Sequence, residues 1–199
     1  MPRFAAVVAL AGVAWLGLWL TNHIPLSIDQ GPITEPGTAI AIDLGLILLF
    51  GLQHSLMARP AWKRRIAHWI PERSAYLLAT TLVLAILFMA WRPLPALVWQ
   101  LPRFIALGQL LGALLATWAV ITLDARAFLG LRPQPSGLRT TGPYRYGVHH
   151  QWARHPIMLG TLLALWCAPT MTQGHLLFSA SMTIYAILGT ILESRDLNR

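Results

Sequence analysis

The chain has 199 residues, of which 56% are hydrophobic and only 11% are charged, and its formal net charge is +8. Soluble domains carry about 25% charged residues, so this composition excludes an ordinary soluble protein. The basic residues cluster in the loops between apolar runs, which argues against a nucleic-acid partner. The single cysteine, Cys167, excludes an intrachain disulfide and a multi-cysteine metal site, and we expect no metal.

Apolar runs of nearly membrane-spanning length recur along the chain and predict six spans. The first is about Phe4–Leu20. Because no convincing small-residue cleavage site follows it, we expect a membrane span and not a cleaved signal peptide. The second is about Ala39–Met57; it contains Asp43, either a packing partner or a residue near the far surface. The basic stretch after it has an amphipathic core, Ala61–Ile70, predicted to lie in the plane of the membrane surface.

The third and fourth spans are predicted at about Ala75–Trp91 and Phe104–Leu123. On the fourth, Gly108, Gly112 and Ala116 are spaced by four residues. This spacing places small side chains on one helix face and predicts close packing against another helix.

A polar segment from Asp124 to His155 follows, and its prolines and glycines disfavour a continuous helix. The last two spans, about Pro156–Cys167 and His175–Leu192, are predicted to form a hairpin. At 1.5 Å per residue its arms are about 20 Å and 28 Å long. Tilt can absorb that difference, so we expect Arg154, His155 and Glu193 to share one level.

The lysines and arginines determine the predicted orientation, because loops on the cytoplasmic side are enriched in them. All of them except Arg92 and Arg103 fall on one side if both termini are cytoplasmic. The predicted fold is therefore an all-α, polytopic membrane helix bundle with cytoplasmic N and C termini. Residues 1–199 form a single membrane-embedded domain of about six spans, two of them allowed to be shorter or kinked.

Oppositely charged residues meet at one end of the predicted hairpin. Pro156 suits the first turn of a helix, so Arg154 and His155 precede a helix N-terminus, where free amides favour anions. Glu193 closes the last span. A ligand with both a carboxylate and an ammonium group could be held between them. The alternative for Arg154 is that it only reflects the excess of basic residues on the cytoplasmic side.

Three sequence stretches resemble the cofactor-binding half of the isoprenylcysteine carboxyl methyltransferase superfamily: Gly142–Tyr146, Arg154–Gly160 and Leu192–Leu197. Within it the resemblance is greatest to the bacterial methanethiol S-methyltransferases, to which Phe50–Pro60 and Thr170–Phe178 also point, and Glu72–Tyr76 fits the same group. Here Gly147–Ala153 separates the Tyr-Arg-Tyr and Arg-His-Pro motifs, which the family joins almost directly.

The resemblance implies an integral membrane enzyme of the bacterial inner membrane that uses S-adenosylmethionine, with its active site facing the cytoplasm. Its acceptor would be a small thiol such as methanethiol, giving dimethyl sulfide, and its other partner would be membrane lipid. Residues 142–199 would form the cofactor-binding part, and residues 4–141 the scaffold and substrate side. The implied cofactor-binding residues are Tyr144, Arg145, Tyr146, Arg154, His155, Pro156, Leu159, Gly160 and Glu193.

His54 is the candidate catalytic residue. A thiol with a pKa of about 8.5 is mostly protonated at neutral pH, so a base or a positive field favours its attack. His54 lies near the cytoplasmic end of the second span, and polar residues inside spans are often functional. The candidate substrate residues are Gln53, His54, Ser55 and Arg59. The alternative for His54 is a hydrogen-bonded packing role.

Three other functions remain open from the sequence. The first is methylation of a prenylcysteine or lipid acceptor. The second is a haem-binding membrane protein, because the first half also resembles NnrU-type proteins; two of His54, His155 and His175 would then be axial ligands. The third is a structural subunit without activity.

Overall fold

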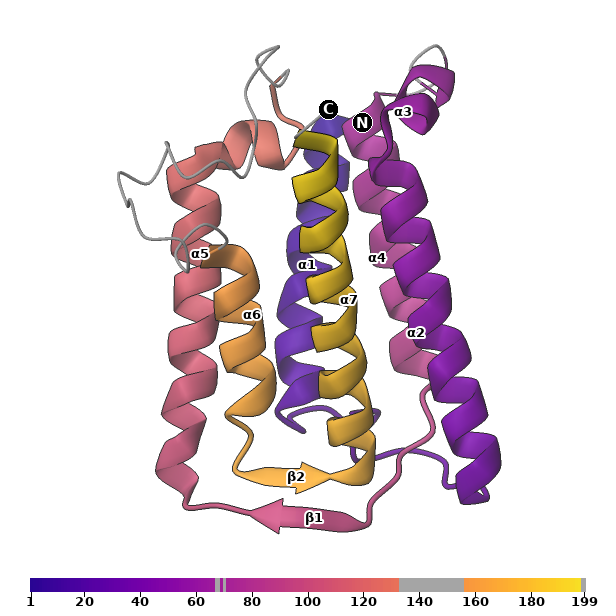
Figure 1. The fold of residues 1–199 in the computed structure, drawn as a ribbon, viewed down its shortest axis with the longest axis vertical. Coiled ribbons are helices and arrows are strands. Elements are labelled where there is room, and N and C mark those ends of the chain that lie inside the picture. The colour runs from indigo at the N-terminus through magenta and orange to yellow at the C-terminus, as the bar shows by residue number, and fades with distance from the viewer. Residues whose placement is uncertain (67–68, 70, 133–155, 198–199) are drawn as a thin grey trace.

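The computed structural model describes residues 1–66, 69, 71–132 and 156–197. It is an elongated helical bundle with a two-stranded ribbon across one end (Figure 1). Its elements in chain order are α1 (Pro2–Leu20), α2 (Pro36–Ala58), α3 (Pro60–Ile66), α4 (Glu72–Ala90), β1 (Leu97–Gln100), a 3-10 turn (Arg103–Ile105), α5 (Ala106–Phe128), α6 (Pro156–Trp166), β2 (Thr170–Thr172) and α7 (Gln173–Leu197).

The helices alternate in direction between two ends of the bundle. We call the end with β1 and β2 the distal end, and the opposite end, where α1 starts and α7 finishes, the proximal end (Figure 1). The basic connection that contains α3 lies at the proximal end. The predicted helical runs are confirmed to within a few residues, and the two termini share one end as predicted.

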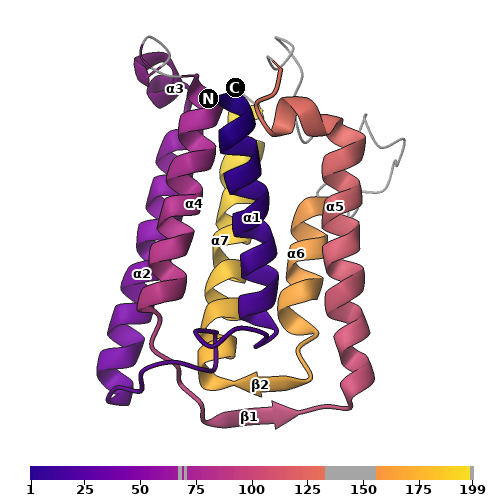
Figure 2. The same cartoon turned by 180° about the vertical axis from the view of Figure 1, so that it is seen from behind.

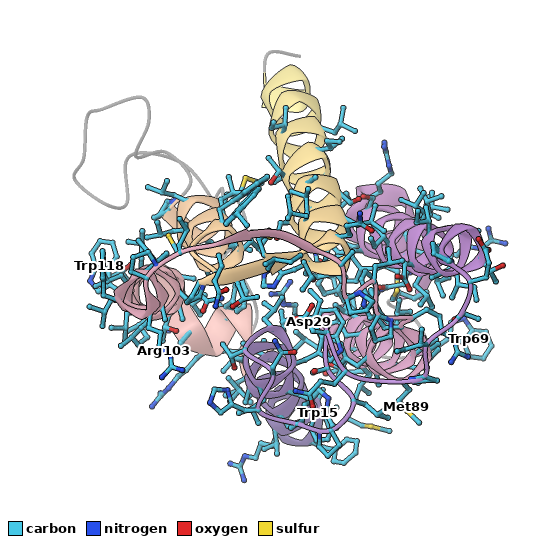
Figure 3. The ribbon with its side chains drawn as sticks, turned by 90° about the horizontal axis from the view of Figure 1, so that it is seen from below. Trp15, Asp29, Trp69, Met89, Arg103 and Trp118 are labelled. Carbon is cyan, nitrogen blue, oxygen red and sulfur yellow. The ribbon has the colours of Figure 1, made fainter. Side chains whose placement is uncertain are left out.

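Four helices within the described residues are long and apolar enough to cross a membrane: Pro2–Leu20, Pro36–Ala58, Glu72–Ala90 and Arg103–Thr122. Large apolar side chains on them are exposed, which suits a lipid environment and not water. Viewed from the distal end, Trp15, Met89 and Trp118 point outward while Asp29 lies in the middle (Figure 3). The molecule is therefore a helical bundle with an apolar outer surface, and it holds Asp29 in its interior at the distal end.

Two groups of helices make up the bundle. Helix α5 packs along α6, and α4 packs against both α1 and α2 (Figure 2). Helix α7 touches α2 on one side and α6 on the other, so it links the two groups.

The apolar core is concentrated toward the distal end. Trp19 is fully buried, and its ring lies 5.2–5.3 Å from those of Phe88, Trp91 and Phe178. The Trp91 indole donates to the carbonyl of Ile28 at 3.0 Å, which attaches the 21–35 connection to this cluster. Aromatic contacts of this kind add to the stability gained from burial.

The β1–β2 ribbon is a feature that the sequence did not predict. The strands are antiparallel, and Leu97 pairs with Thr172 and Gln100 with Thr170. Both strands lie in segments that the sequence predicted to be loops. That prediction was made because each segment is short and has prolines close by. The ribbon joins the connection before α5 to the connection before α7, so the all-α prediction is correct for the bundle and wrong for this distal end.

Buried and half-buried polar residues complete the distal end. The Asp29 carboxylate accepts from Asn22 at 2.7 Å and from Thr172 at 2.5 Å. His175, at the start of α7, is 1% exposed. Asp43 is a packing partner and not a surface residue, because it is fully buried and accepts from the backbone N–H of Arg92 at 2.9 Å.

Glu35 caps the distal start of α2. Its carboxylate accepts from the amides of Gly37 at 3.0 Å and Thr38 at 2.8 Å, which the first helical turn leaves without partners. The Gly37 amide, and then the Thr38 amide and hydroxyl, hold the pKa of the Glu35 carboxyl below its usual value of 4.5. The cap is therefore strongest when this carboxyl is ionised.

We expect Glu35→Ala to lower the melting temperature of the protein in detergent at neutral pH. Because the folded pKa is depressed, the charged cap contributes stability above the unfolded pKa and loses it as the pH falls through the folded value. The difference in melting temperature between wild type and variant should thus become smaller below about pH 4.5. Melting curves across this range test it, with Glu35→Gln as the control that keeps an acceptor oxygen without charge. A pH-independent gap would contradict the assignment.

Candidate functional site

A polar cluster lies where the proximal parts of α2, α4 and α7 meet. Its centre is His54, whose Nε2 and Nδ1 lie 2.7 Å and 3.0 Å from the hydroxyl of Tyr76 on α4. Either ring nitrogen can therefore pair with this hydroxyl, depending on the tautomer. The predicted catalytic histidine is half-buried and held by a hydrogen bond from a neighbouring helix.

Aromatic rings surround the His54 imidazole. The ring centroids of Phe50, Tyr76 and Tyr185 lie 5.3, 5.1 and 6.2 Å from it. Phe50 precedes His54 by one helical turn, and Tyr185 comes from α7. A Cβ on Gly51 would lie 3.4 Å from the Tyr185 ring, so this glycine lets α7 approach α2 closely. The imidazole is consequently placed in a largely apolar, aromatic environment.

The other predicted substrate residues differ in their contacts and exposure. Ser55 shares a hydrogen bond with the Tyr185 hydroxyl at 3.0 Å and so joins α2 to α7. Gln53 donates to Thr80 at 3.3 Å, and its carbonyl oxygen is buried with no partner in the part of the chain that the structure describes. Arg59 is exposed at the end of α2. The structure thus gathers Gln53, His54 and Ser55, and leaves Arg59 on the surface.

Arg73 extends the cluster to α5. Its Nε donates to the carbonyl of Phe128 at 2.6 Å. Its guanidinium carbon lies 4.7 Å from the centre of the Phe128 ring and 5.1 Å from that of Tyr76. These cation–π distances place a positive charge next to the tyrosine that contacts His54.

Most of the predicted cofactor-binding residues lie outside the described residues: Tyr144, Arg145, Tyr146, Arg154 and His155. Of the others, Pro156 is buried at the start of α6 and Leu159 is exposed. Glu193 falls in the last turns of α7, and its side chain is not among those described.

The two arms of the last hairpin are less equal than predicted. Helix α6 has 11 residues and α7 has 25, or about 16 Å and 37 Å at 1.5 Å per residue. Both extend from the distal ribbon, so α6 begins partway up the bundle whereas α7 reaches the proximal end (Figure 1). The first turn of α6 and the turn carrying Glu193 are therefore not at one level along the bundle.

Gly160 lies in the contact between α6 and α5. A Cβ on Gly160 would lie 2.6 Å from the carbonyl oxygen of Gly112 and 2.7 Å from the nitrogen of Ala116. A Cβ on Gly112 would lie 2.5 Å from backbone atoms of Gly160 and Ala164. The predicted small-residue face on the fourth span is confirmed, and α6 is the helix that packs on it.

Three residues of the cluster received no role from the sequence: Arg73, Tyr76 and Tyr185. Arg73 and Tyr76 are three positions apart in α4 and share one helix face, although the predicted span began only at Ala75. That spacing was a usable signal for their proximity. Nothing local indicated that Tyr185 would meet Ser55, because the two are 130 residues apart.

The structure excludes one of the histidine pairs considered as axial haem ligands. His54 lies near the proximal end of α2, and His175 is buried in the first turn of α7 at the distal end. These two histidines cannot bind one iron together. Pairs that include His155 involve a residue outside the described part of the chain.

Comparisons with known proteins give one matching family and several similar relatives. Residues 44–198 match the NnrU protein family. Methanethiol S-methyltransferase 2 of Bradyrhizobium diazoefficiens is 41% identical over 87% of this chain and 71% of its own length. Methanethiol S-methyltransferase of Mycobacterium tuberculosis is 31% identical over 87% and 76%. Nurim of Xenopus laevis is 30% identical over 89% and 69%. No solved structure matches the chain.

Proposed function

The chain belongs to the NnrU family and to the group of its methanethiol S-methyltransferase relatives, and from this premise we propose that it is an integral membrane methyltransferase that methylates methanethiol. The observation that carries the proposal is the 41% identity to one such enzyme over most of both chains. The cluster around His54 supports it, because a half-buried imidazole among aromatic rings suits a small, weakly polar thiol.

We propose S-adenosylmethionine as the methyl donor, which when bound supplies a methyl group on a positively charged sulfur. The residues that would hold it are Tyr144, Arg145, Tyr146, Arg154, His155, Pro156, Leu159 and Glu193. One observation on α6 fits this: the helix begins with a proline, a residue suited to a first helical turn, and the N-terminal end of a helix favours anions such as a carboxylate. Gly160 supports the site indirectly by seating α6 on α5.

On the acceptor side, His54 would take the proton from the thiol as the sulfur becomes a nucleophile. Tyr76 holds the imidazole by its hydrogen bond, and the Arg73 guanidinium provides a positive field close by. A positive group beside a thiolate lowers the cost of its charge, which apolar surroundings alone would raise.

The bacterial inner membrane is the proposed location, with six spans and the active site facing the cytoplasm. The placement of nearly all lysines and arginines in segments that begin or end at the proximal end supports this orientation. The acceptor cluster lies toward the same end, where a soluble methyl donor would arrive.

The proposal is tested by offering methanethiol, or a farnesylcysteine analogue, with methyl-labelled S-adenosylmethionine to the purified protein. Labelled dimethyl sulfide from the first acceptor supports the assignment. Preference for the farnesylated acceptor would replace it with a prenylcysteine methyltransferase. A Soret band without transfer to either acceptor would favour the haem-binding alternative.

His155→Ala and Glu193→Ala are each expected to weaken S-adenosylhomocysteine binding at least tenfold, about 1.4 kcal/mol. The physical reason is that each substitution removes a hydrogen-bonding or charged partner of the ligand. Isothermal titration calorimetry on the detergent-solubilised protein measures this. His23→Ala, at an exposed position near the distal end, serves as the matched control. Wild-type affinity in both variants would remove these residues from the cofactor site.

A further inference from the structure

Arg73 joins two helices that otherwise belong to different groups of the bundle. It lies in the first turn of α4, and its Nε donates to the carbonyl of Phe128, the last residue of α5, at 2.6 Å. Its guanidinium is also within 4.7 Å of the Phe128 ring centre and 5.1 Å of the Tyr76 ring centre. One cation is therefore in contact with a ring on each of the two helices.

The end of α5 is shaped to receive this side chain. Gly130 has a φ of 71°, which favours glycine, and the Leu131 amide bonds back to the Arg126 carbonyl at 2.8 Å. A Cβ on Gly130 would lie 2.8 Å from Cγ of Arg73. The glycine turn thus ends α5 and also makes room for the arginine.

The last turns of α5 lean toward the middle of the bundle (Figures 1 and 2). Thr122 precedes them, and its hydroxyl bonds back to the carbonyls of Trp118 at 3.0 Å and Ala119 at 3.1 Å. Such back-bonding often bends helices. The lean brings Phe128 within reach of α4, so the contact depends on a shape built into α5.

The contact lies between the two halves of the proposed reaction. On one side, the Arg73 guanidinium faces the Tyr76 ring, and the Tyr76 hydroxyl holds His54. On the other side, α5 packs along α6, whose first turn is part of the proposed donor site. At the distal end the β1–β2 ribbon already connects these groups.

We propose that Arg73 is a positioning residue that fixes the distance between the acceptor helices α2 and α4 and the donor helices α5 and α6. The inference rests on the proposed methyltransferase function. In-line transfer requires the reacting atoms to lie about 3–3.5 Å apart, and a displacement of 1 Å can cost about 100-fold in rate. Loss of the contact should therefore affect turnover more than ligand binding.

The test separates geometry from activity. Spin labels are placed at Leu82→Cys on α4 and Ile121→Cys on α5, both exposed, after replacing Cys167, the one natural cysteine, by serine. Arg73→Ala and Gly130→Ala should each broaden the distribution of distances between the two labels or increase its mean. They should lower kcat about 10- to 100-fold and leave S-adenosylhomocysteine affinity within twofold. Arg73→Lys, which keeps the charge without the Nε donor, should fall between wild type and Arg73→Ala.

Arg103→Ala is the matched control, because this arginine is exposed at the distal end. An unchanged distance in both Arg73→Ala and Gly130→Ala overturns the proposal, and so does a changed distance with unchanged kcat. Full recovery of kcat by Arg73→Lys with the distance still altered would show that charge, and not position, matters. A wild-type protein inactive on every thiol would refute the proposed function instead, and the distance measurement would still report whether the contact holds.

Discussion

Replacing His54 by alanine should lower the rate of thiol methylation by about 100- to 10,000-fold, the range that general acid–base groups contribute. The imidazole is the ionisable group at the centre of the aromatic cluster, and the Tyr76 hydroxyl lies 2.7 Å from its Nε2. Without it, the thiol must ionise unaided. The measurement is single-turnover transfer of a labelled methyl group to methanethiol as a function of pH.

The pH profile makes this test specific. If His54 acts as the base, the rate of His54→Ala should rise with the fraction of thiolate formed in solution, up to the thiol's own pKa of about 8.5. Cofactor affinity should stay at the wild-type value. His23→Ala, an exposed histidine near the other end of the bundle, should leave the rate unchanged. A His54→Ala enzyme with a wild-type rate and profile would show that this histidine only packs.

Gly112→Ala and Gly160→Ala should each destabilise the folded protein by about 1–3 kcal/mol, the usual range for overpacking. The added Cβ would lie 2.5–2.7 Å from backbone atoms of the facing helix, which cannot rotate away as a side chain could. Helices α5 and α6 must then separate. Unfolding in detergent, followed by far-UV circular dichroism, gives the change in the free energy of unfolding.

Two other helical glycines provide the comparison. Gly17 on α1 and Gly45 on α2 have no atom within 4 Å of an added Cβ. Alanine there should be neutral or stabilising, by up to about 1 kcal/mol, because alanine favours helices over glycine. The double variant of Gly112 and Gly160 should cost less than the sum of the single ones, since both disturb one contact. Equal effects at all four glycines would contradict the close approach.

The helical part of the fold was predictable because each apolar run is long and bounded by prolines or charged residues. The close-packing face on α5 was also predictable, since three small residues at spacing four have few other uses in a membrane helix. The ribbon was not, because its pairing joins segments about 70 residues apart and depends on the bundle that brings them together.

The candidate site was predictable only in part. His54 is notable in the sequence because it is a titratable residue inside an apolar run. Its partners are less visible: Tyr76 and Tyr185 reach it from α4 and α7, and their meeting depends on helix packing. Arg154 and His155 lie outside the described residues, but α6 and α7 both extend from the distal ribbon and tilt does not absorb the difference in their lengths, so the first turn of α6 and the turn carrying Glu193 lie at different levels.

The short α6 has a consequence for how reactants arrive. Its first residue is about 16 Å above the distal ribbon, against a hydrocarbon layer about 30 Å thick. The helix start therefore lies about halfway through the thickness of that layer. Small volatile sulfur compounds dissolve readily in lipid, so the bilayer itself would act as the reservoir that concentrates them and stores the product.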